Sequence, residues 1–384
     1  MKKRHSTKGL RTWIEVDRSR VAKNYATFRK MIKPDCLLMS VVKSNAYGHE
    51  LISFAKEMET LGVDWLGVDS IVEGTALRKA GIFTPILVLG YTAPECIESA
   101  VKHKMSITVS NQDTLDEVLK YAKGLSGKEK LSIHIKADTG MHRQGFMKDK
   151  VAGVADLLNE HQGAVIVEGL YTHFAEAKNS AEKSNTHAQI ENFNEVVKVF
   201  SEKGINPIIH ACATGGAMLF PEAHFDMVRI GIGMYGAYPS KEAREYAEEK
   251  HPLTPALSWK TIIAEVKDLP DGGEVGYDFT DSVTKDSRIA VCPIGYWHGY
   301  TRALSSLGFM LVGGKRARIV GRISMDMVVL DITGISDVKV GNEVVVIGEQ
   351  GEEKLHSDEQ AFLAKTTSYE FLTCINPLIA RLYS

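Results

Sequence analysis

The chain has 384 residues, of which 44% are hydrophobic and 24% charged, a composition typical of a globular protein with a sizeable core. Its net charge of −2 excludes a basic field for nucleic acid or anionic lipid. The sequence has no run of about 18 apolar residues and therefore predicts no membrane span. The charged N-terminal cluster has no apolar segment behind it, which argues against a secretory signal, so we expect a cytoplasmic protein.

Cysteine usage agrees with that compartment. The chain has five cysteines, an odd number, and none belongs to a C-x-x-C pair. This pattern disfavours a disulfide framework and a cysteine-based zinc site, and we expect no bound metal. The thiols should be small core residues in a reducing environment. They are Cys36, Cys96, Cys212, Cys292 and Cys374.

Short apolar, β-branched runs recur through the first two thirds of the chain, as expected for strands buried on both faces of a parallel sheet. They lie at residues 37–42, 65–68, 86–89, 106–109, 131–136, 165–171, 207–211 and 227–231. Segments with helical spacing of apolar residues lie between the runs, for example Val151, Val154, Leu157 and Leu158. Eight alternations in about 240 residues predict an N-terminal (β/α)8 barrel, or TIM barrel.

From about residue 253 the pattern changes to strand-like runs separated by turns such as Gly313-Gly314. These runs lie at residues 261–266, 289–293, 308–312, 318–323, 327–332 and 343–347. We therefore expect an α/β protein with a barrel domain over residues 10–250, followed by a mostly β domain over residues 251–384.

Lys43 lies at the carboxyl end of the first predicted barrel strand, where barrel active sites form. An ammonium group in a low-dielectric barrel mouth has a lowered pKa, and its neutral amine is a nucleophile for a carbonyl group. Taken alone, this lysine is more simply a solvated residue at the end of a strand.

Residues 136–143, Lys-Ala-Asp-Thr-Gly-Met-His-Arg, follow the fifth predicted strand and so lie at the same end of the barrel. Arg143 can bind a carboxylate with two parallel hydrogen bonds. Lys136 and Asp138 are two residues apart on a strand and face the same side. A surface ion pair followed by a turn at Gly140 explains this segment equally well.

The glycines 231, 233 and 236 satisfy the pattern G-x-G-x-x-G, which is associated with dinucleotide binding. Here the pattern follows the eighth predicted strand, and no later strand ends in a ribose-binding acid. In a barrel the same glycines let backbone N–H groups approach a phosphate, and Thr214 is placed to add a hydroxyl.

The C-terminal part presents Tyr277 and, in residues 293–300, Tyr296. A tyrosine becomes a useful base only where cationic neighbours lower its usual pKa of about 10. In isolation, each is more simply a packed side chain with a satisfied hydroxyl.

Together, these clusters resemble the motifs of the alanine racemases, a family of fold-type III pyridoxal-phosphate enzymes. The similar segments occur in the family's order between about Trp13 and Tyr383. They are residues 42–49 (Val-Lys-Ser-Asn-Ala-Tyr-Gly-His), 136–143, 228–232, 275–277, 321–326 and 368–370. Six motifs in order are a far more specific signal than any one of them.

The resemblance implies a homodimeric isomerase that interconverts L-alanine and D-alanine and supplies D-alanine for peptidoglycan. Lys43 would hold pyridoxal 5'-phosphate as a Schiff base and act on the D face of the substrate. Tyr277 of a partner subunit would act on the L face. Two bases suit racemisation because a proton leaves one face of Cα and returns to the other.

The resemblance also implies the remaining site residues. Lys136, often a carbamate in the family, would orient Arg143, which with the backbone of Met325 would bind the substrate carboxylate. Arg229 would face the pyridine nitrogen, which it cannot readily protonate because its pKa exceeds about 12. The phosphate would be surrounded by Tyr47, Thr214, Gly231, Ile232 and Tyr369. Supporting roles would fall to His173, Tyr296 and Asp326.

The sequence departs from the family pattern at Ala213, at Trp297-His298 and at residues 376–381, which concerns the shape of the entrance and the substrate breadth. A broad-specificity or serine racemase stays open, although Tyr369 favours alanine because serine-preferring relatives tend to carry Asn there. A decarboxylase of basic amino acids would carry glutamate at the position of Arg229, so Arg229 argues against this alternative. A non-catalytic cofactor-binding barrel protein would lack the β domain, which this chain has. The alternative of a dinucleotide oxidoreductase depends only on the glycines at 231, 233 and 236.

Overall fold

The computed structural model describes residues 7–125, 130–161, 163, 165–179, 181 and 183–384. Most of the charged N-terminal cluster noted above lies outside the described residues. The described chain separates into two compact units. The first, called the barrel unit here, holds Ala22–Ala46 and Leu51–Leu253. The second, called the β unit, holds the described residues up to Val21, together with Tyr47–Glu50 and Thr254–Ser384.

The barrel unit is built on a closed ring of eight parallel strands, in which each pairs with the next and the last pairs with the first. In ring order the strands are β2 (Leu37–Val41), β3 (Trp65–Val68), β4 (Ile86–Val88), β5 (Ser106–Val109), β6 (Leu131–Asp138), β8 (Val165–Tyr171), β9 (Ile208–His210) and β10 (Met227–Ile230). Seven of the eight predicted runs contain one of these strands, and β6 extends beyond its run 131–136 to Asp138, so the barrel prediction is confirmed.

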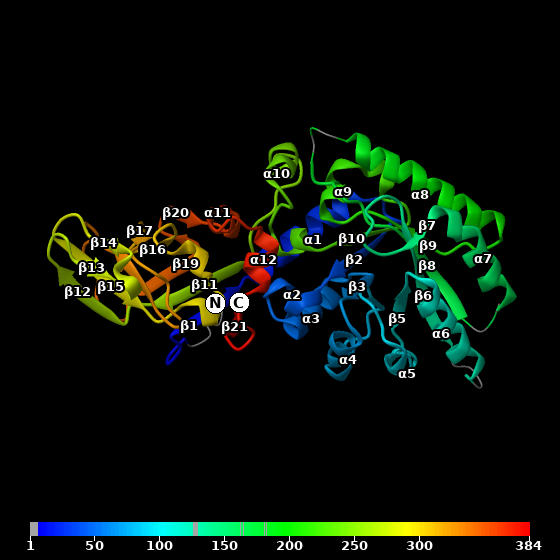
Figure 1. Ribbon diagram of the computed structural model, residues 1–384, viewed down its shortest axis with the longest axis horizontal. Coiled ribbons are helices and arrows are strands. Elements are labelled where there is room, and N and C mark those ends of the chain that lie inside the picture. The colour runs from blue at the N-terminus through cyan, green and yellow to red at the C-terminus, as the bar shows by residue number, and fades with distance from the viewer. Residues whose placement is uncertain (1–6, 126–129, 162, 164, 180, 182) are drawn as a thin grey trace. The chain divides into compact units, whose positions relative to one another are not determined.

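Helices lie outside the ring of strands (Figure 1). They are α3 (Leu51–Leu61), α4 (Ile71–Lys79), α5 (Ile97–Lys102), α6 (Gln112–Lys123), α7 (Val151–Glu160), α8 (Ser184–Glu202), α9 (Thr214–Leu219) and α10 (Lys241–Ala247), while α1 (Arg18–Met31) begins in the β unit's residues and continues in the barrel unit's. The apolar stripe predicted for α7 is confirmed because Val151, Val154 and Leu158 are buried. Asn111 begins α6 by accepting a hydrogen bond from the N–H of Thr114 at 2.8 Å, as a helix cap should.

The β unit contains a mostly antiparallel sheet in the order β12-β15-β18-β17-β16-β19-β11-β1-β21, with β20 beside β19. The strands are β1 (Thr12–Val16), β11 (Leu257–Ile262), β12 (Glu265–Leu269), β15 (Ser287–Cys292), β16 (Phe309–Val312), β17 (Lys315–Ile319), β18 (Val328–Asp331), β19 (Glu343–Gln350), β20 (Glu353–Leu355) and β21 (Ala380–Tyr383). A small hairpin is formed by β13 (Glu274–Val275) and β14 (Asp281–Ser282), and the unit's two helices beyond residue 350 are α11 (Ser357–Leu363) and α12 (Ser368–Thr373). The predicted mostly β character is confirmed.

Two of the predicted runs in the β unit are wrong in their bounds. The run 261–266 is broken between β11 and β12 because the chain changes partner there: Ile263 N–H donates to Asn342, whereas Ala264 N–H donates to Val291. The run 318–323 ends early, at Ile319, because Gly321 turns the backbone with a φ of +74°.

Cysteine burial follows the expectation only in part. Cys36, Cys212 and Cys292 are buried, as predicted for core residues, and burial raises the pKa of each thiol. Cys96 is half-buried and Cys374 is exposed, so the core assignment is wrong for Cys374. All five thiols are free.

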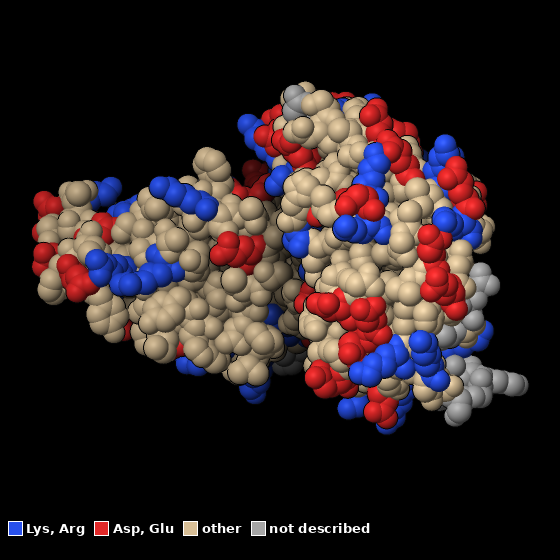
Figure 2. Space-filling view, turned by 45° about the vertical axis from the view of Figure 1, so that its right-hand side comes forward, with Lys and Arg blue, Asp and Glu red and all other residues tan. Residues whose placement is uncertain are grey.

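Surface charge is mixed in sign. Figure 2 shows Lys and Arg side chains interspersed with Asp and Glu over the visible face of the barrel unit, in line with a net charge of −2. Among the described residues, the helices lack the combination of length and apolar character that crossing a lipid bilayer requires.

Gly169 on β8 has no room for a side chain, because a Cβ there would stand 2.0 Å from His134 Nδ1 on β6. Gly169→Ala should therefore lower the free energy of unfolding by about 1–3 kcal/mol. The matched control is Gly153→Ala in α7, where a Cβ meets nothing within 4 Å, and which should raise stability by up to about 1 kcal/mol. Urea unfolding checks both, and equal effects would contradict the packing argument.

Candidate active site

Lys43 begins a strained turn that follows β2. In α2 (Lys43–Tyr47) the residues Ser44, Asn45 and Ala46 have φ between 51° and 56°, so their backbone is left-handed. Such a conformation costs an L-residue about 1–2 kcal/mol. Tyr47 continues this conformation with a φ of 49°, and four consecutive residues keep it only where their surroundings hold them, as occurs at functional sites.

Glu73 on α4 supplies that restraint. Its Oε1 accepts hydrogen bonds from the N–H groups of Ser44 at 2.7 Å and Asn45 at 3.4 Å, and its Oε2 accepts from the N–H of Asp69 at 2.8 Å. One carboxylate thus joins the turn after β2 to the end of β3. The sequence reasoning missed Glu73, although Ser70 and Glu73 have the Ser-x-x-Glu spacing of a helix start.

The amine of Lys43 has an acidic neighbour. Lys43 Nζ lies 3.2 Å from Asp69 Oδ1, with 37% and 55% of the two side chains exposed. At that exposure the pair adds little to stability, roughly 0–1 kcal/mol. The amine is therefore held at the carboxyl end of the barrel yet stays open to solvent.

Further cations gather in the barrel unit around Lys136. Burial first, and then the charges of Arg143, Arg229 and Lys43 among its neighbours, lower the pKa of Lys136 to about 8. Lys136 Nζ donates to Gln144 Oε1 at 3.2 Å. In the part of the chain that the structure describes, Arg143 is exposed and makes no ion pair. This excess of positive charge suits a ligand with several negative groups.

Arg229 on β10 is buried, and acceptors surround one end of its guanidinium. Nη1 lies 2.9 Å from His210 Nδ1, while Nη2 donates to the carbonyls of Thr172 and Ala211, both at 2.9 Å, and lies 3.2 Å from His173 Nδ1. Burial lowers the pKa of Arg229 to about 10, so it stays charged at neutral pH. Within the described residues, none of these hydrogen bonds uses Nε, which leaves that N–H for a ligand.

The predicted phosphate segment forms a compact turn next to Thr214. Thr214 Oγ1 accepts a hydrogen bond from the N–H of Gly233 at 3.3 Å. The 3-10 turn Ile232–Tyr235 begins after Gly231, and the first N–H groups of such a turn lack acceptors within it. A Cβ at Gly233 would stand 2.4 Å from Phe28 Cζ, so close packing explains this glycine without a dinucleotide.

The β unit holds the other predicted phosphate residues, Tyr47 and Tyr369 of α12. Their ring centroids are 6.0 Å apart and both side chains are largely buried. Burial raises the pKa of Tyr47 to about 12, and burial together with Tyr47 raises the pKa of Tyr369. Both are therefore neutral phenols at pH 7 and can donate hydrogen bonds to an anion.

Tyr277 projects from the surface of the β unit. It begins the 3-10 turn Tyr277–Phe279, with 67% of Tyr277 and 65% of Phe279 exposed. Asp278 between them forms an ion pair with Arg322 and has a φ of 59°, which fixes the turn. The structure thus places Tyr277 on a solvent-exposed turn of the β unit.

The remaining predicted residues of the β unit lie on two neighbouring segments. The N–H groups of Tyr296 and Trp297 donate to the carbonyls of Ser324 and Met325, at 3.1 and 3.0 Å. About half of each of the side chains of Tyr296, Trp297 and Met325 is exposed.

The next residues on these two segments also interact. The negative charge of Asp326 raises the pKa of His298, but burial outweighs it and leaves that pKa lowered.

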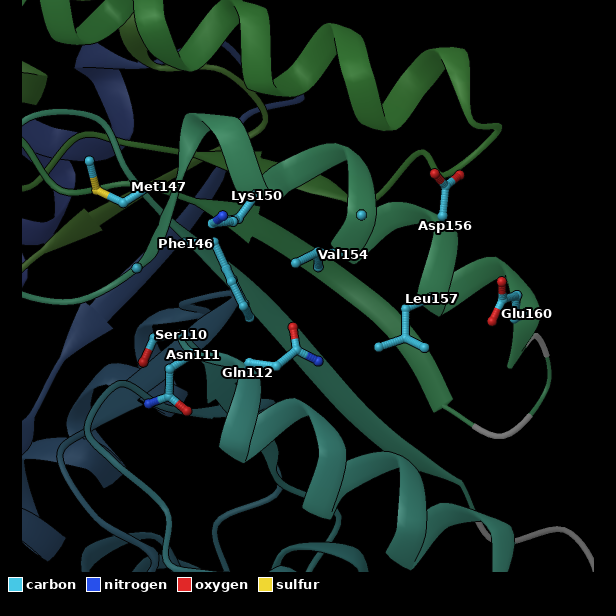
Figure 3. Close-up of a pocket in the computed structure, with 12 residues that line it drawn as sticks. Ser110, Asn111, Gln112, Phe146, Met147, Lys150, Val154, Asp156, Leu157 and Glu160 are labelled. Atoms are coloured by element: carbon cyan, nitrogen blue, oxygen red, sulfur yellow. The ribbon is translucent and has the colours of Figure 1, made fainter.

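A cavity of about 700 Å³ lies elsewhere in the barrel unit, between the start of α6 and α7, and its polar lining includes Asn111 and Lys150 (Figure 3). None of its lining residues is a predicted site residue. The candidate site is therefore defined by side chains at the carboxyl ends of the barrel strands and not by this cavity.

Comparison with known proteins matches both parts of the chain. Residues 16–239 match the alanine racemase N-terminal domain, and residues 256–383 match the alanine racemase C-terminal domain. The chain is 38% identical over 377 residues to the alanine racemase of Methanococcus maripaludis, covering 97% of this chain and 98% of that protein. It is 37% identical over 374 residues to alanine racemase 2 of Bacillus subtilis, covering 97% and 94%.

Solved structures agree with the sequence matches. The alanine racemase of Clostridium difficile superposes with a TM-score of 0.90 at 33% identity, covering 98% of this chain and 96% of that one. The alanine racemase of Bacillus anthracis with bound L-Ala-P gives 0.90 at 34% identity, covering 97% and 95%. The chain belongs to the alanine racemase family.

Membership in the alanine racemase family confirms the resemblance seen in the motifs and the two-part fold. Of the residues predicted from that resemblance, the barrel unit contains Lys43, Lys136, Arg143, His173, Thr214, Arg229, Gly231 and Ile232. The β unit contains Tyr47, Tyr277, Tyr296, Met325, Asp326 and Tyr369.

Glu73→Ala should loosen the turn that carries Lys43, because it removes the acceptor of three backbone N–H groups. Backbone N–H groups left without partners cost about 1–3 kcal/mol each when buried and less near solvent, so we expect a loss of about 1–3 kcal/mol in total. Hydrogen exchange measured by mass spectrometry should speed up selectively in peptides covering Ser44, Asn45 and Asp69.

The matched control for this prediction is Glu117→Ala on α6, an exposed carboxylate that pairs with Lys120 on the same helix. Its removal should change stability by less than about 0.5 kcal/mol and leave exchange near Lys43 as it was. Unchanged hydrogen exchange in Glu73→Ala would show that the turn keeps its conformation without Glu73 and would contradict the prediction.

Proposed function

We propose that the chain interconverts L-alanine and D-alanine with pyridoxal 5'-phosphate bound through Lys43. The observation that carries the proposal is the guanidinium of Arg229, buried, charged and held at Nη1 and Nη2, with Nε left for an acceptor. This geometry suits the pyridine nitrogen of the cofactor. When bound, pyridoxal phosphate makes the Cα proton of an attached amino acid removable by delocalising the resulting negative charge.

The donors of the chain fit the rest of that cofactor. The phosphate needs several hydrogen-bond donors, and we assign this role to the neutral phenols of Tyr47 and Tyr369, the hydroxyl of Thr214 and the N–H groups of Gly231 and Ile232. Lys43 supplies the amine for a covalent link. The cations near Lys136 offset the negative charges of the cofactor and of a substrate carboxylate.

Proton transfer falls to two groups in this proposal. The amine of Lys43 would take or return a proton on the D face of Cα. Tyr277 serves the L face and comes from a second copy of the chain. The exposure of Tyr277 and of the neighbouring Phe279 supports this arrangement, because large aromatic side chains so exposed are commonly covered by a partner.

The substrate carboxylate is assigned to Arg143 and to the backbone at Met325. Arg143 is exposed and makes no ion pair within the described residues, so it is available for a carboxylate. We further propose that Lys136 is carbamylated and then orients Arg143. Its lowered pKa of about 8 favours the neutral amine that this modification needs.

Arg229 also affects which reaction of the cofactor is favoured. Even at a pKa of about 10 it stays protonated and does not give its proton to a ring nitrogen of lower basicity. With Arg229 at its ring nitrogen, the cofactor would accept negative charge less readily, which would favour return of the proton to Cα over transamination or decarboxylation.

The proposal also includes the roles of the two domains and the location of the protein in the cell. We assign cofactor binding to residues 10–250 and the second base to residues 251–384, in a cytoplasmic homodimer that supplies D-alanine for peptidoglycan. A racemase of broader specificity, acting also on serine, is the second candidate. It is favoured by Ala213, which starts α9 without a side-chain cap, and by the half-exposed Trp297.

The protein purified with pyridoxal phosphate should racemise alanine in both directions and reach equal amounts of the two enantiomers. Borohydride reduction followed by peptide mass mapping should place the cofactor on Lys43. Lys43→Arg keeps the charge but should lose the label and at least about a thousandfold of the activity, because it removes both the link and one base. Serine and lysine as substrates distinguish the second candidate, and a label on another lysine would contradict the assignment.

Tyr277→Phe should separate the two bases. We expect exchange of the α-proton of L-alanine with deuterated water to fall by about a hundredfold or more, and exchange of D-alanine to be far less affected. NMR of the alanine α-proton measures both rates. Phe279→Leu, on the same turn but without a titratable group, is the control. An equal loss for both enantiomers in Tyr277→Phe would remove the two-base assignment.

A further inference from the structure

Tyr277 lies on a hairpin that is too small to hold its own shape. The strands β13 and β14 have two residues each, and the base of the hairpin is closed by backbone hydrogen bonds of Val283 with Gly272 and Gly273. A two-stranded hairpin is marginally stable at best in water. The position of Tyr277 therefore depends on what the hairpin packs against.

The hairpin packs against residues 318–322, which form the end of β17 and the turn that follows it. A Cβ at Gly321 would stand 2.5 Å from the carbonyl oxygen of Val275, and a Cβ at Gly276 would stand 3.3 Å from the backbone nitrogen of Arg322. The two backbones thus approach each other closely where both segments carry glycine. Because β17 pairs with β16 on one side and β18 on the other, it is fixed within the sheet.

The carboxylate of Asp281 joins the hairpin to β17. Its Oδ2 accepts hydrogen bonds from Nη1 of Arg318 at 2.9 Å and from the N–H of Gly321 at 3.1 Å. Its Oδ1 accepts from the N–H of Ser282 at 2.9 Å. In the hairpin, Asp281 of β14 pairs with Val275 of β13. One carboxylate therefore connects both strands of the hairpin to the end of β17.

Asp281 makes these hydrogen bonds as a largely buried anion. Only 14% of its side chain is exposed. Burial alone would raise the pKa of Asp281, but hydrogen bonds with Ser306, Gly321 and Arg318 outweigh it and leave the pKa lowered. Asp281 is therefore ionised at neutral pH, and hydrogen bonds to an ionised acceptor are roughly twice as strong as those between neutral groups.

Asp278 supplies a second and weaker connection. It forms an ion pair with Arg322, but both side chains are open to solvent. Ion pairs of this kind contribute little, because water and salt screen the two charges. The hairpin is therefore held mainly through Asp281.

The segment that Asp281 binds leads directly to the backbone that we assign to the substrate carboxylate. Gly321 lies four residues before Met325, and both belong to the β unit together with Tyr277. Asp281 thus sets the position of Tyr277 relative to the backbone at Met325. Proton transfer is sensitive to such positions, since a displacement of about 1 Å can cost about a hundredfold in rate.

We propose that Asp281 is a positioning residue for Tyr277. By binding Arg318 and Gly321, it keeps the turn that carries the phenol in one place relative to Met325. Without its carboxylate, the guanidinium of Arg318 and the N–H of Gly321 lose this acceptor, and the hairpin is free to move away from β17. The attachment belongs to the chain itself, whereas its effect on proton transfer rests on the proposed function.

Asp281→Ala is the test variant, and Asp281→Asn is the conservative one because an amide oxygen still accepts from Arg318 and Gly321. Arg318→Met removes the charged donor and leaves Asp281 in place, so it tests the same connection if Asp281→Ala does not fold. The control is Asp286→Ala. Asp286 is an exposed aspartate of the β unit that accepts from the N–H of Asp271 and lies outside this connection.

The first experiment is hydrogen exchange of the full-length protein loaded with pyridoxal phosphate, measured by mass spectrometry. Asp281→Ala should speed exchange by about tenfold in peptides that cover residues 274–283, and Arg318→Met should do so to a smaller extent. Asp281→Asn and Asp286→Ala should leave these peptides nearly unchanged. Unchanged exchange in a folded Asp281→Ala or Arg318→Met variant would overturn the proposal, whether or not the chain is a racemase.

The second experiment measures exchange of the alanine α-proton with deuterated water. Asp281→Ala should lower the rate for L-alanine by about tenfold to a hundredfold and the rate for D-alanine far less, because Lys43 serves the D face. Asp281→Asn should keep most of the rate for L-alanine. In a Tyr277→Phe background, Asp281→Ala should have little further effect.

Two results of the second experiment would show that Asp281 only supports the fold. One is an equal loss for both enantiomers in Asp281→Ala, and the other is an undiminished further loss in the Tyr277→Phe background. If the unaltered chain racemises no amino acid, the proposed function fails, while the hydrogen-exchange test of the attachment keeps its meaning.

Discussion

The guanidinium of Arg229 is a permanent positive charge buried among the strands of a barrel, and its need for partners shapes much of the barrel's interior. An unpaired buried cation costs several kcal/mol even after the protein relaxes around it. Here two backbone carbonyls and two imidazoles meet that need, because β8 and β9 end opposite each other, at Tyr171 and His210, beside the strand that carries Arg229. The imidazole nitrogens that face Arg229 must in turn be unprotonated, so the charge of Arg229 determines where its histidine neighbours carry their protons.

A second constraint acts at the end of β2, the strand that pairs with β10. The turn after Lys43 adopts a backbone conformation that its residues disfavour, and a single carboxylate, that of Glu73, holds it. Arg229 is a charged side chain buried in the barrel, and the turn after Lys43 has a strained backbone, so both features are unfavourable locally. Proteins tolerate such violations mainly where function requires them, and the surrounding packing supplies the compensation.

The sequence was sufficient for the elements that depend on local pattern. The eight barrel strands are short apolar runs whose burial on both faces is visible residue by residue, and Lys43, Arg143 and Arg229 stand within recognisable consecutive motifs. What could not be predicted depends on residues distant in the chain. Glu73 acts on a turn 29 residues earlier, and His134 meets a ring 76 residues away. A lone histidine within an apolar strand carries no signal of such a partner, since its role arises only when the ring of strands closes.

The strand β1 also escaped prediction, and its pairing has a consequence for synthesis. β1 lies between β11 and the parallel β21, with Trp13 opposite Ala380 and Val16 opposite Tyr383. β1 therefore gains its second neighbour only when β21 has been made, whereas all the barrel strands are complete once Ile230 has been made. In the interval one edge of β1 has no strand partner, so the sheet of the β unit is completed only after the barrel strands have been synthesised.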